Sequence, residues 1–151
     1  MKTAQAGILL LVLALAGYFL ARQFAGYSDV ARQVSVDECD LGAGACVSEL
    51  DGMRVAVSIG PRSIPLMQPL RVQVELDGAE YLPERLDITG LNMEMGLNRT
   101  VFEPGQGSRW VGETILPICS QRRMHWRAVL RLQGAGGPVE LVYQFHTRRS
   151  G

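Results

Sequence analysis

Short segments in which apolar and polar residues alternate constrain the fold of this chain most strongly. In residues 53–59 the apolar row is Met53, Val55, Val57 and Ile59, and in residues 70–76 it is Leu70, Val72, Val74 and Leu76. Successive side chains of a β-strand point to opposite faces of the sheet, so this alternation is typical of strands with one buried face.

Further candidate strands follow at short intervals along the chain. They are Arg85–Met95, Asn98–Glu103, Ser108–Leu116, Met124–Leu132 and Val139–Thr147. Glycine-rich and proline-containing turns are expected at residues 104–107 and 134–138. About seven short strands without a helical period predict an all-β fold, an immunoglobulin-like or cupredoxin-like β-sandwich.

The first 22 residues carry a nearly uninterrupted apolar run from Ala6 to Ala21, preceded by Lys2. Its length lies between that of a secretory signal and that of a full membrane span. Cleavage after Ala14-Leu15-Ala16 would leave only half of the run as a signal sequence, so we predict an uncleaved N-terminal transmembrane helix over residues 1–22.

Behind this anchor we expect a tether over residues 23–48 and one β-sandwich domain over residues 49–151. The tether holds Cys39 and Cys46 in the sequence CDLGAGAC, whose glycines allow the two sulfurs to meet. A Cys39–Cys46 disulfide, and thus an oxidising compartment, is the simplest account. The alternatives are two reduced thiols or a Cys46–Cys119 pair.

Met93 and Met95 form a Met-x-Met-Gly segment at the end of a predicted strand. If the strand continues without a bulge, both side chains follow the outward row of Arg85 and Asp87. A bulge at Gly90 would turn both inward, into the core. Exposed thioethers favour Cu(I) over hard cations, so the first alternative indicates copper and the second indicates packing.

A second group of candidate ligands lies in CSQRRMH, from Cys119 to His125. The alternation of the strand that follows directs Met124 inward and His125 outward. Loops and strand ends of a sandwich cluster at its two ends, so Met93, Met95, Cys119 and His125 are expected to meet if they share one end, with Met124 as an alternative ligand. Such a mixed sulfur and nitrogen set would bind Cu(I). His146 is expected to be only solvated.

An N-terminal anchor, a seven-strand domain and the Met93/Met95 pair resemble the membrane-anchored FixH and YtkA-like proteins and, more distantly, the periplasmic copper chaperones of cytochrome oxidase assembly. The resemblance is architectural, apart from the methionine pair. It implies a single-pass protein of the bacterial inner membrane with its C-terminal domain in the periplasm, acting as a Cu(I) chaperone or copper homeostasis factor. It also implies a respiratory oxidase or a copper-delivery protein as partner.

The sequence disfavours enzymes and nucleic-acid-binding proteins as functional classes. No motif of a hydrolase, metalloprotease or phosphate-binding loop occurs, so no enzymatic activity is expected. With 15 basic and 15 acidic residues the chain is balanced, which argues against nucleic-acid binding. The competing interpretation is a metal-free β-sandwich that acts as an interaction module of an inner-membrane complex, with the Met93-Glu94-Met95-Gly96 segment as an apolar contact.

We expect a reporter that is active only outside the cytoplasm to give signal when fused after residue 48. The reason is the Cys39/Cys46 pair downstream of an apolar segment. Activity of a cytoplasm-specific reporter at the same fusion point would contradict this location. The mass of the mature chain distinguishes an uncleaved anchor from a cleaved signal sequence, because a chain with an uncleaved anchor starts at or near Met1.

Overall fold

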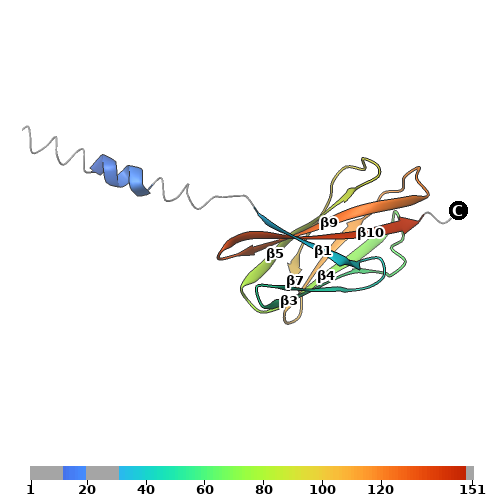
Figure 1. Cartoon of the computed structure of the whole chain (residues 1–151), viewed down its shortest axis with the longest axis horizontal. Helices are drawn as coiled ribbons and strands as arrows, with labels where there is room; N and C mark the ends of the chain where they lie inside the picture. The colour runs from blue at the N-terminus through green and yellow to red at the C-terminus, as the bar shows by residue number, and fades with distance from the viewer. Residues whose placement is uncertain (1–11, 20–30, 149–151) are drawn as a thin grey trace, which may run out of the picture. The chain divides into compact units, whose positions relative to one another are not determined.

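Figure 1 shows the chain in a computed structural model, which describes residues 12–19 and 31–148. The chain divides into two units, residues 1–30 and residues 31–151. Residues 12–19 of the first unit are helical. Among the described residues no helix is long and apolar enough to span a membrane. Most of the predicted anchor over residues 1–22 lies outside the described residues, so that prediction remains open.

The second unit is an all-β sandwich of ten strands in two five-stranded sheets. The strands are β1 (Arg32–Asp40), β2 (Cys46–Leu50), β3 (Met53–Gly60), β4 (Pro69–Asp77), β5 (Tyr81–Gly90), β6 (Asn98–Val101), β7 (Glu103–Pro104), β8 (Arg109–Ile115), β9 (Arg123–Gly134) and β10 (Gly137–Arg148). One sheet has the order β1-β10-β9-β5-β6 and the other β2-β3-β4-β8-β7. Neighbours pair antiparallel except β1 and β10, which are parallel.

The seven predicted strands correspond to β3, β4, β5, β6, β8, β9 and β10, and three strands are additional. β1 and β2 lie in residues 32–50, so the prediction of a tether over residues 23–48 is wrong for residues 32–48. These residues were missed because β1 is held by parallel pairing with the distant β10, a contact that local alternation does not reveal. β7 has two residues and carries no periodic signal of its own.

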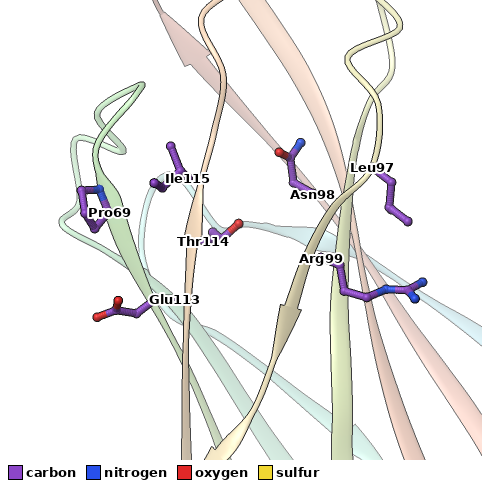
Figure 2. A pocket seen from close by; sticks show the side chains of 7 residues that line it. All are labelled: Pro69, Leu97, Asn98, Arg99, Glu113, Thr114 and Ile115. Atoms are coloured by element: carbon purple, nitrogen blue, oxygen red, sulfur yellow. The ribbon is translucent and has the colours of Figure 1, made fainter.

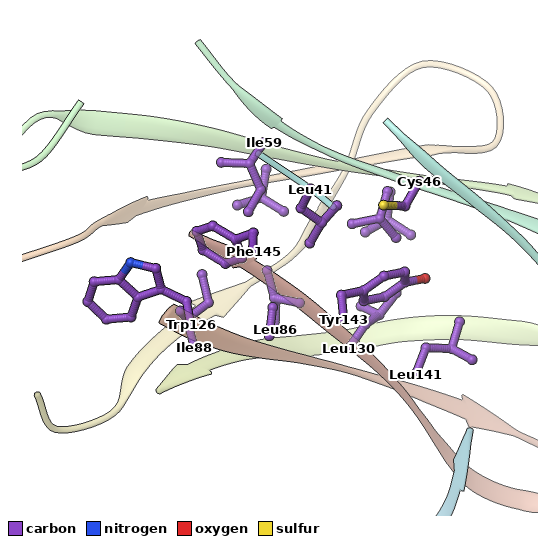
Figure 3. Packing of buried hydrophobic residues seen from close by; sticks show 14 of the residues in the cluster. Leu41, Cys46, Ile59, Leu86, Ile88, Trp126, Leu130, Leu141, Tyr143 and Phe145 are labelled. Carbon is purple, nitrogen blue, oxygen red and sulfur yellow. The ribbon is translucent and has the colours of Figure 1, made fainter. Parts of the chain in front are cut away.

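The inner faces of the two sheets form the core. The buried residues of β3 and β4 are the apolar rows seen in the sequence, and Leu86 and Ile88 of β5 are also fully buried. Figure 3 shows Trp126, Leu130, Tyr143 and Phe145 from β9 and β10 packed towards Ile59, Leu41 and Cys46. Trp126 donates a hydrogen bond to Thr147 Oγ1 (2.9 Å), which satisfies its buried indole N–H.

At two places the chain passes directly from an edge strand of one sheet into an edge strand of the other. β1 passes into β2 through residues 41–45, and β6 passes into β7 through Phe102. The Cys39–Cys46 disulfide joins β1 to β2, which confirms this pairing over the alternatives open from the sequence. The disulfide therefore connects the edges of the two sheets.

Two turns show how local sequence fixes the sheet order. Asp51 and Gly52 both have positive φ, as a two-residue hairpin turn between β2 and β3 requires. At Gly112 of β8, an added Cβ would lie 2.4 Å from Thr100 Cγ2 and 2.7 Å from the Val101 carbonyl oxygen. Only glycine at this position lets β6 lie close over β8 at the crossing between sheets.

The phenol of Tyr143 links the two sheets and gives a prediction for alkaline pH. Its hydroxyl lies 3.4 Å from Ser48 Oγ, and burial raises the pKa of Tyr143 to about 12, against a smaller lowering by the Ser48 hydrogen bond. The ordinary pKa of tyrosine is about 10. The protonated phenol of Tyr143 therefore contributes fully to the free energy of unfolding below about pH 10, and this contribution is lost as pH rises through about 12. Tyr143→Phe is therefore expected to lose less stability than the parent chain over this interval in urea unfolding. The same alkaline loss in both proteins would contradict the assignment.

Candidate functional site

Three loops from both sheets meet at one end of the sandwich, the end at which β10 finishes (Figure 1). They are residues 61–68 between β3 and β4, residues 91–97 between β5 and β6, and residues 116–122 between β8 and β9. We call these loops, together with the first two residues of β9, the methionine end, because they hold Met67, Met93, Met95 and Met124.

Backbone hydrogen bonds join these loops to one another and to β9. The Met67 N–H donates to the Leu116 carbonyl (2.9 Å), which ties the first loop to the third. The Leu91 N–H donates to the His125 carbonyl (2.8 Å), which ties the second loop to β9. The first bond lies within the sheet of β3, β4 and β8 and the second within the sheet of β5 and β9, so each bond fastens a loop to a neighbour in its own sheet.

Asn92 fastens the loop of residues 91–97 with its side chain. Its Nδ2 donates to the Arg123 carbonyl and its Oδ1 accepts from the His125 N–H, both at 3.0 Å. One exposed amide thereby satisfies two backbone groups at the start of β9, beyond the last residue of β5. These bonds replace the strand pairing that a longer β5 would have made.

Gly90 is the residue at which β5 ends and the chain turns. A Cβ at this position would lie 2.2 Å from the Met93 carbonyl oxygen and 3.0 Å from Met124 Cε. The chain therefore folds back over Gly90, and residues 91–97 form a loop. The predicted continuation of the strand to Met95, with both methionines on the outward row, is wrong, and β5 ends without the bulge that was the alternative.

The sulfur-bearing side chains of the methionine end differ in exposure. Met124 and Cys119 are buried, with 2% and 9% of their surface exposed, and Met93 and Met95 are half-buried against the same core. Ser120 Oγ lies 3.9 Å from Met93 Sδ, and the Cys119 thiol points towards the Gln121 carbonyl oxygen at 3.5 Å. Two loops and the start of β9 thus place three thioethers and one thiol at one end of the core.

His125 lies apart from these sulfurs. β9 alternates as predicted, with Met124 buried and His125 exposed on the outer face of its sheet. The predicted five-residue set is therefore divided, because consecutive residues of one strand cannot both face the core. His125 instead lies opposite His146 of β10, which the sequence analysis expected to be only solvated.

Met67 also lies at the methionine end, a position that the sequence did not predict. Its side chain is 62% exposed, and its φ of 59° lies in the left-handed region that is uncommon for residues with a Cβ. No pattern in residues 61–68 indicated this position. The position depends on the order β3-β4-β8 and on the bond to Leu116, both of which are tertiary.

Among the side chains that the structure describes, no group of three or more His, Cys, Asp or Glu that could hold a metal ion occurs. A metal at the methionine end would therefore need thioether ligands in addition to Cys119. Thioethers are weak ligands for zinc and for hard cations, whereas Cu(I) accepts them at low coordination number. The side chains of this end are therefore of the type that suits a soft ion better than a hard one.

A separate pocket of about 470 Å³ opens at the β6 edge of the sandwich (Figure 2). It is lined by Pro69, Leu97, Asn98, Arg99, Glu113, Thr114 and Ile115. Leu97 and Ile115 are more than half and about half exposed, respectively, and Val101 of the same edge strand is 66% exposed. Within the described part of the chain the buried Asn98 Nδ2 has no hydrogen-bond partner.

Comparisons with protein-family models, with curated proteins and with solved structures found no match to this chain.

Substitution of Gly90 tests whether the turn over this residue holds the methionine end together. Gly90→Ala is expected to lower the free energy of unfolding by about 1–3 kcal/mol, because its Cβ would meet a backbone carbonyl that must move. Gly44→Ala, in the nearby 41–45 turn, is the matched control, since nothing lies within 4 Å of its added Cβ. Equal stability of the two variants in denaturant unfolding would contradict the proposed close approach at Gly90.

Proposed function

We propose that this protein is a membrane-anchored Cu(I)-binding β-sandwich that holds copper at the methionine end, in the periplasm of a bacterium. The observation that carries the proposal is the gathering of Met93, Met95, Met124 and Cys119 at one end of the core by two loops and the start of β9. These side chains offer four soft ligand atoms from two loops and the start of β9, two of them in half-buried side chains, and soft sulfur is the ligand type that Cu(I) prefers.

The difference in exposure supports a role in transfer. Met93 and Met95 are reachable from solvent, whereas Met124 and Cys119 belong to the core. A copper ion delivered by another protein would first meet the half-buried thioethers, and the apolar surroundings would then favour Cu(I) over the more strongly hydrated Cu(II). This is the behaviour of a Cu(I) chaperone or copper homeostasis factor, with a respiratory oxidase or a copper-delivery protein as the partner.

The location rests on two features of the chain. The Cys39–Cys46 disulfide favours an oxidising compartment, and the apolar run of residues 6–21 favours an anchor in the inner membrane. We assign the sandwich to the immunoglobulin-like or cupredoxin-like class, on the strength of its two packed sheets and largely antiparallel pairing.

The proposed role is binding and delivery, not catalysis. A Cys–His pair would need the two side chains within hydrogen-bonding reach of each other. The Cys119 thiol points to the Gln121 carbonyl, and His125 lies on the outer face of β9. This arrangement offers Cys119 as a ligand more readily than as a nucleophile.

Cu(I) titration of the full chain against a competing chelator tests the proposal. Met93→Leu with Met95→Leu is expected to weaken Cu(I) binding at least tenfold, because leucine keeps the apolar volume and removes the sulfur. Such exchanges usually cost less than about 1.5 kcal/mol of stability, so the variant is expected to fold. Met53→Leu is the matched control, because Met53 lies at the β2–β3 turn, at the other end of β3 from the 61–68 loop. Unchanged Cu(I) affinity in the double variant would refute the site.

The β6 edge favours a second candidate function, a metal-free interaction module. An edge strand with exposed Val101, beside a pocket bordered by Leu97 and Ile115, can accept an added strand and an apolar side chain from a partner. The partner would be a component of an inner-membrane complex. This function is independent of the methionines and would stand if copper binding failed.

A photo-crosslinking residue at position 101 tests the second function in native membranes. A discrete crosslinked product is expected from this position, because Val101 borders the open edge. Position 47 is the control, since Val47 is also exposed but belongs to β2, on the other side of the sandwich. The same products from both positions, or none from position 101, would contradict a specific partner at β6.

A further inference from the structure

The sequence contains two histidines, and the fold places them directly opposite each other. His125 of β9 is paired in register with His146 of β10, and their ring centroids are 6.4 Å apart. Both lie on the outer face of the sheet, since their neighbours Met124, Trp126, Phe145 and Thr147 are buried. Side chains paired across antiparallel strands are close enough to share one ligand.

Asp40, at the end of β1, fixes the orientation of one of these rings. Its Oδ2 lies 3.2 Å from His146 Nδ1. A carboxylate at this position stabilises the proton on Nδ1 and leaves the Nε2 lone pair available to a metal. Metal-binding histidines commonly donate their other ring N–H to a carboxylate in this way, and the carboxylate does not itself bind the metal.

The carboxylate of Asp40 is itself held by the 41–45 turn. The Gly42 N–H donates to Asp40 Oδ1 (2.8 Å), and the Ala43 N–H donates to the Asp40 carbonyl (2.9 Å). A Cβ at Gly42 would lie 3.0 Å from Asp40 Oδ1 and 3.3 Å from the His146 carbonyl oxygen. The turn is thus packed tightly onto both residues, which reduces the reorganisation needed on binding.

A pocket of about 330 Å³ gives access to both rings from solvent. Its lining comprises Cys39, Asp40, Arg123, His125, Gln144, Phe145 and His146. Water can complete the coordination of an ion there. Arg123 opposes a bound cation and Asp40 favours it, so the two side chains offset each other in charge.

We infer that His125 and His146 bind a divalent transition-metal ion, with Cu(II) bound more tightly than Zn(II), and that Asp40 is a positioning residue for His146. Metal–imidazole bonds are about 2.0–2.1 Å long, so small side-chain rotations bring two rings at 6.4 Å onto one ion. Imidazole suits Cu(II), which stands highest in the affinity order of divalent ions. The two histidines lie on the opposite face of β9 from Met124, and their site does not depend on Cu(I) binding by the sulfurs.

Cu(II) titration of the full chain, produced without a histidine tag and with the disulfide intact, tests this site. One Cu(II) is expected to bind with nitrogen hyperfine structure in its electron paramagnetic resonance spectrum. His125→Ala with His146→Ala is expected to abolish this signal, and Asp40→Asn to lower the affinity about 10- to 100-fold while keeping the nitrogen couplings. Both histidines are at least partly exposed, so the fold should tolerate the double substitution.

Gln133→Ala, an exposed change near the far end of β9, is the control and should leave Cu(II) binding unchanged. Met93→Leu with Met95→Leu should also leave Cu(II) binding unchanged, which separates this site from the Cu(I) proposal. Cu(II) binding that persists in the double histidine variant, or a spectrum without nitrogen couplings in the parent chain, would overturn the inference. Zn(II) that binds more tightly than Cu(II) would also overturn it.

Discussion

The burial of one face of each sheet against the other is the constraint on which the rest of this structure depends. Valines, leucines and isoleucines of β3 and β4 lie opposite Trp126, Leu130 and Tyr143 of the second sheet, and nearly all of these side chains are fully buried. Because side chains alternate along a strand, burying Trp126 also commits Met124 to the core and His125 to the outer surface. The core therefore determines which side chains each face of β9 presents: the thioether of Met124 on the inner face and the imidazole of His125 on the outer face.

The edges of the sheets are protected by the chain itself. On one side of the sandwich β1 continues into β2, and on the other side β6 continues into β7. The edges of the two sheets are therefore joined by the chain on both sides. The Cys39–Cys46 disulfide adds about 2–3 kcal/mol for a loop of this length in the chain-entropy model. It also fixes the end of β1, and with it Asp40 beside His146. β6 carries the exposed Val101 and borders the pocket of about 470 Å³, which is why the proposed partner is placed at this edge.

Seven strands could be predicted from alternation alone, because each has one buried face and therefore a regular sequence pattern. β1 and β2 could not, since their place depends on a parallel contact and on a disulfide between segments that look like a tether. The orientation of Met93 and Met95 depended on Gly90 and Asn92, whose roles arise from contacts with β9. The predicted turn at 134–138, centred on Gly136, would place His125 opposite Thr147. In the structure Gly134 pairs with Gly137, and this register places His125 opposite His146.

In the function proposed here, Cu(I) is held by sulfur from Met93, Met95, Met124 and Cys119 and not by the outward histidines. X-ray absorption at the copper edge of the Cu(I)-loaded full chain measures this directly, because sulfur and imidazole nitrogen scatter at different distances and imidazole adds outer-shell features. A Cu(I) edge with a first shell of sulfur only is expected, unchanged by His125→Ala with His146→Ala. Imidazole scattering in the Cu(I) form, or a first shell without sulfur, would contradict it.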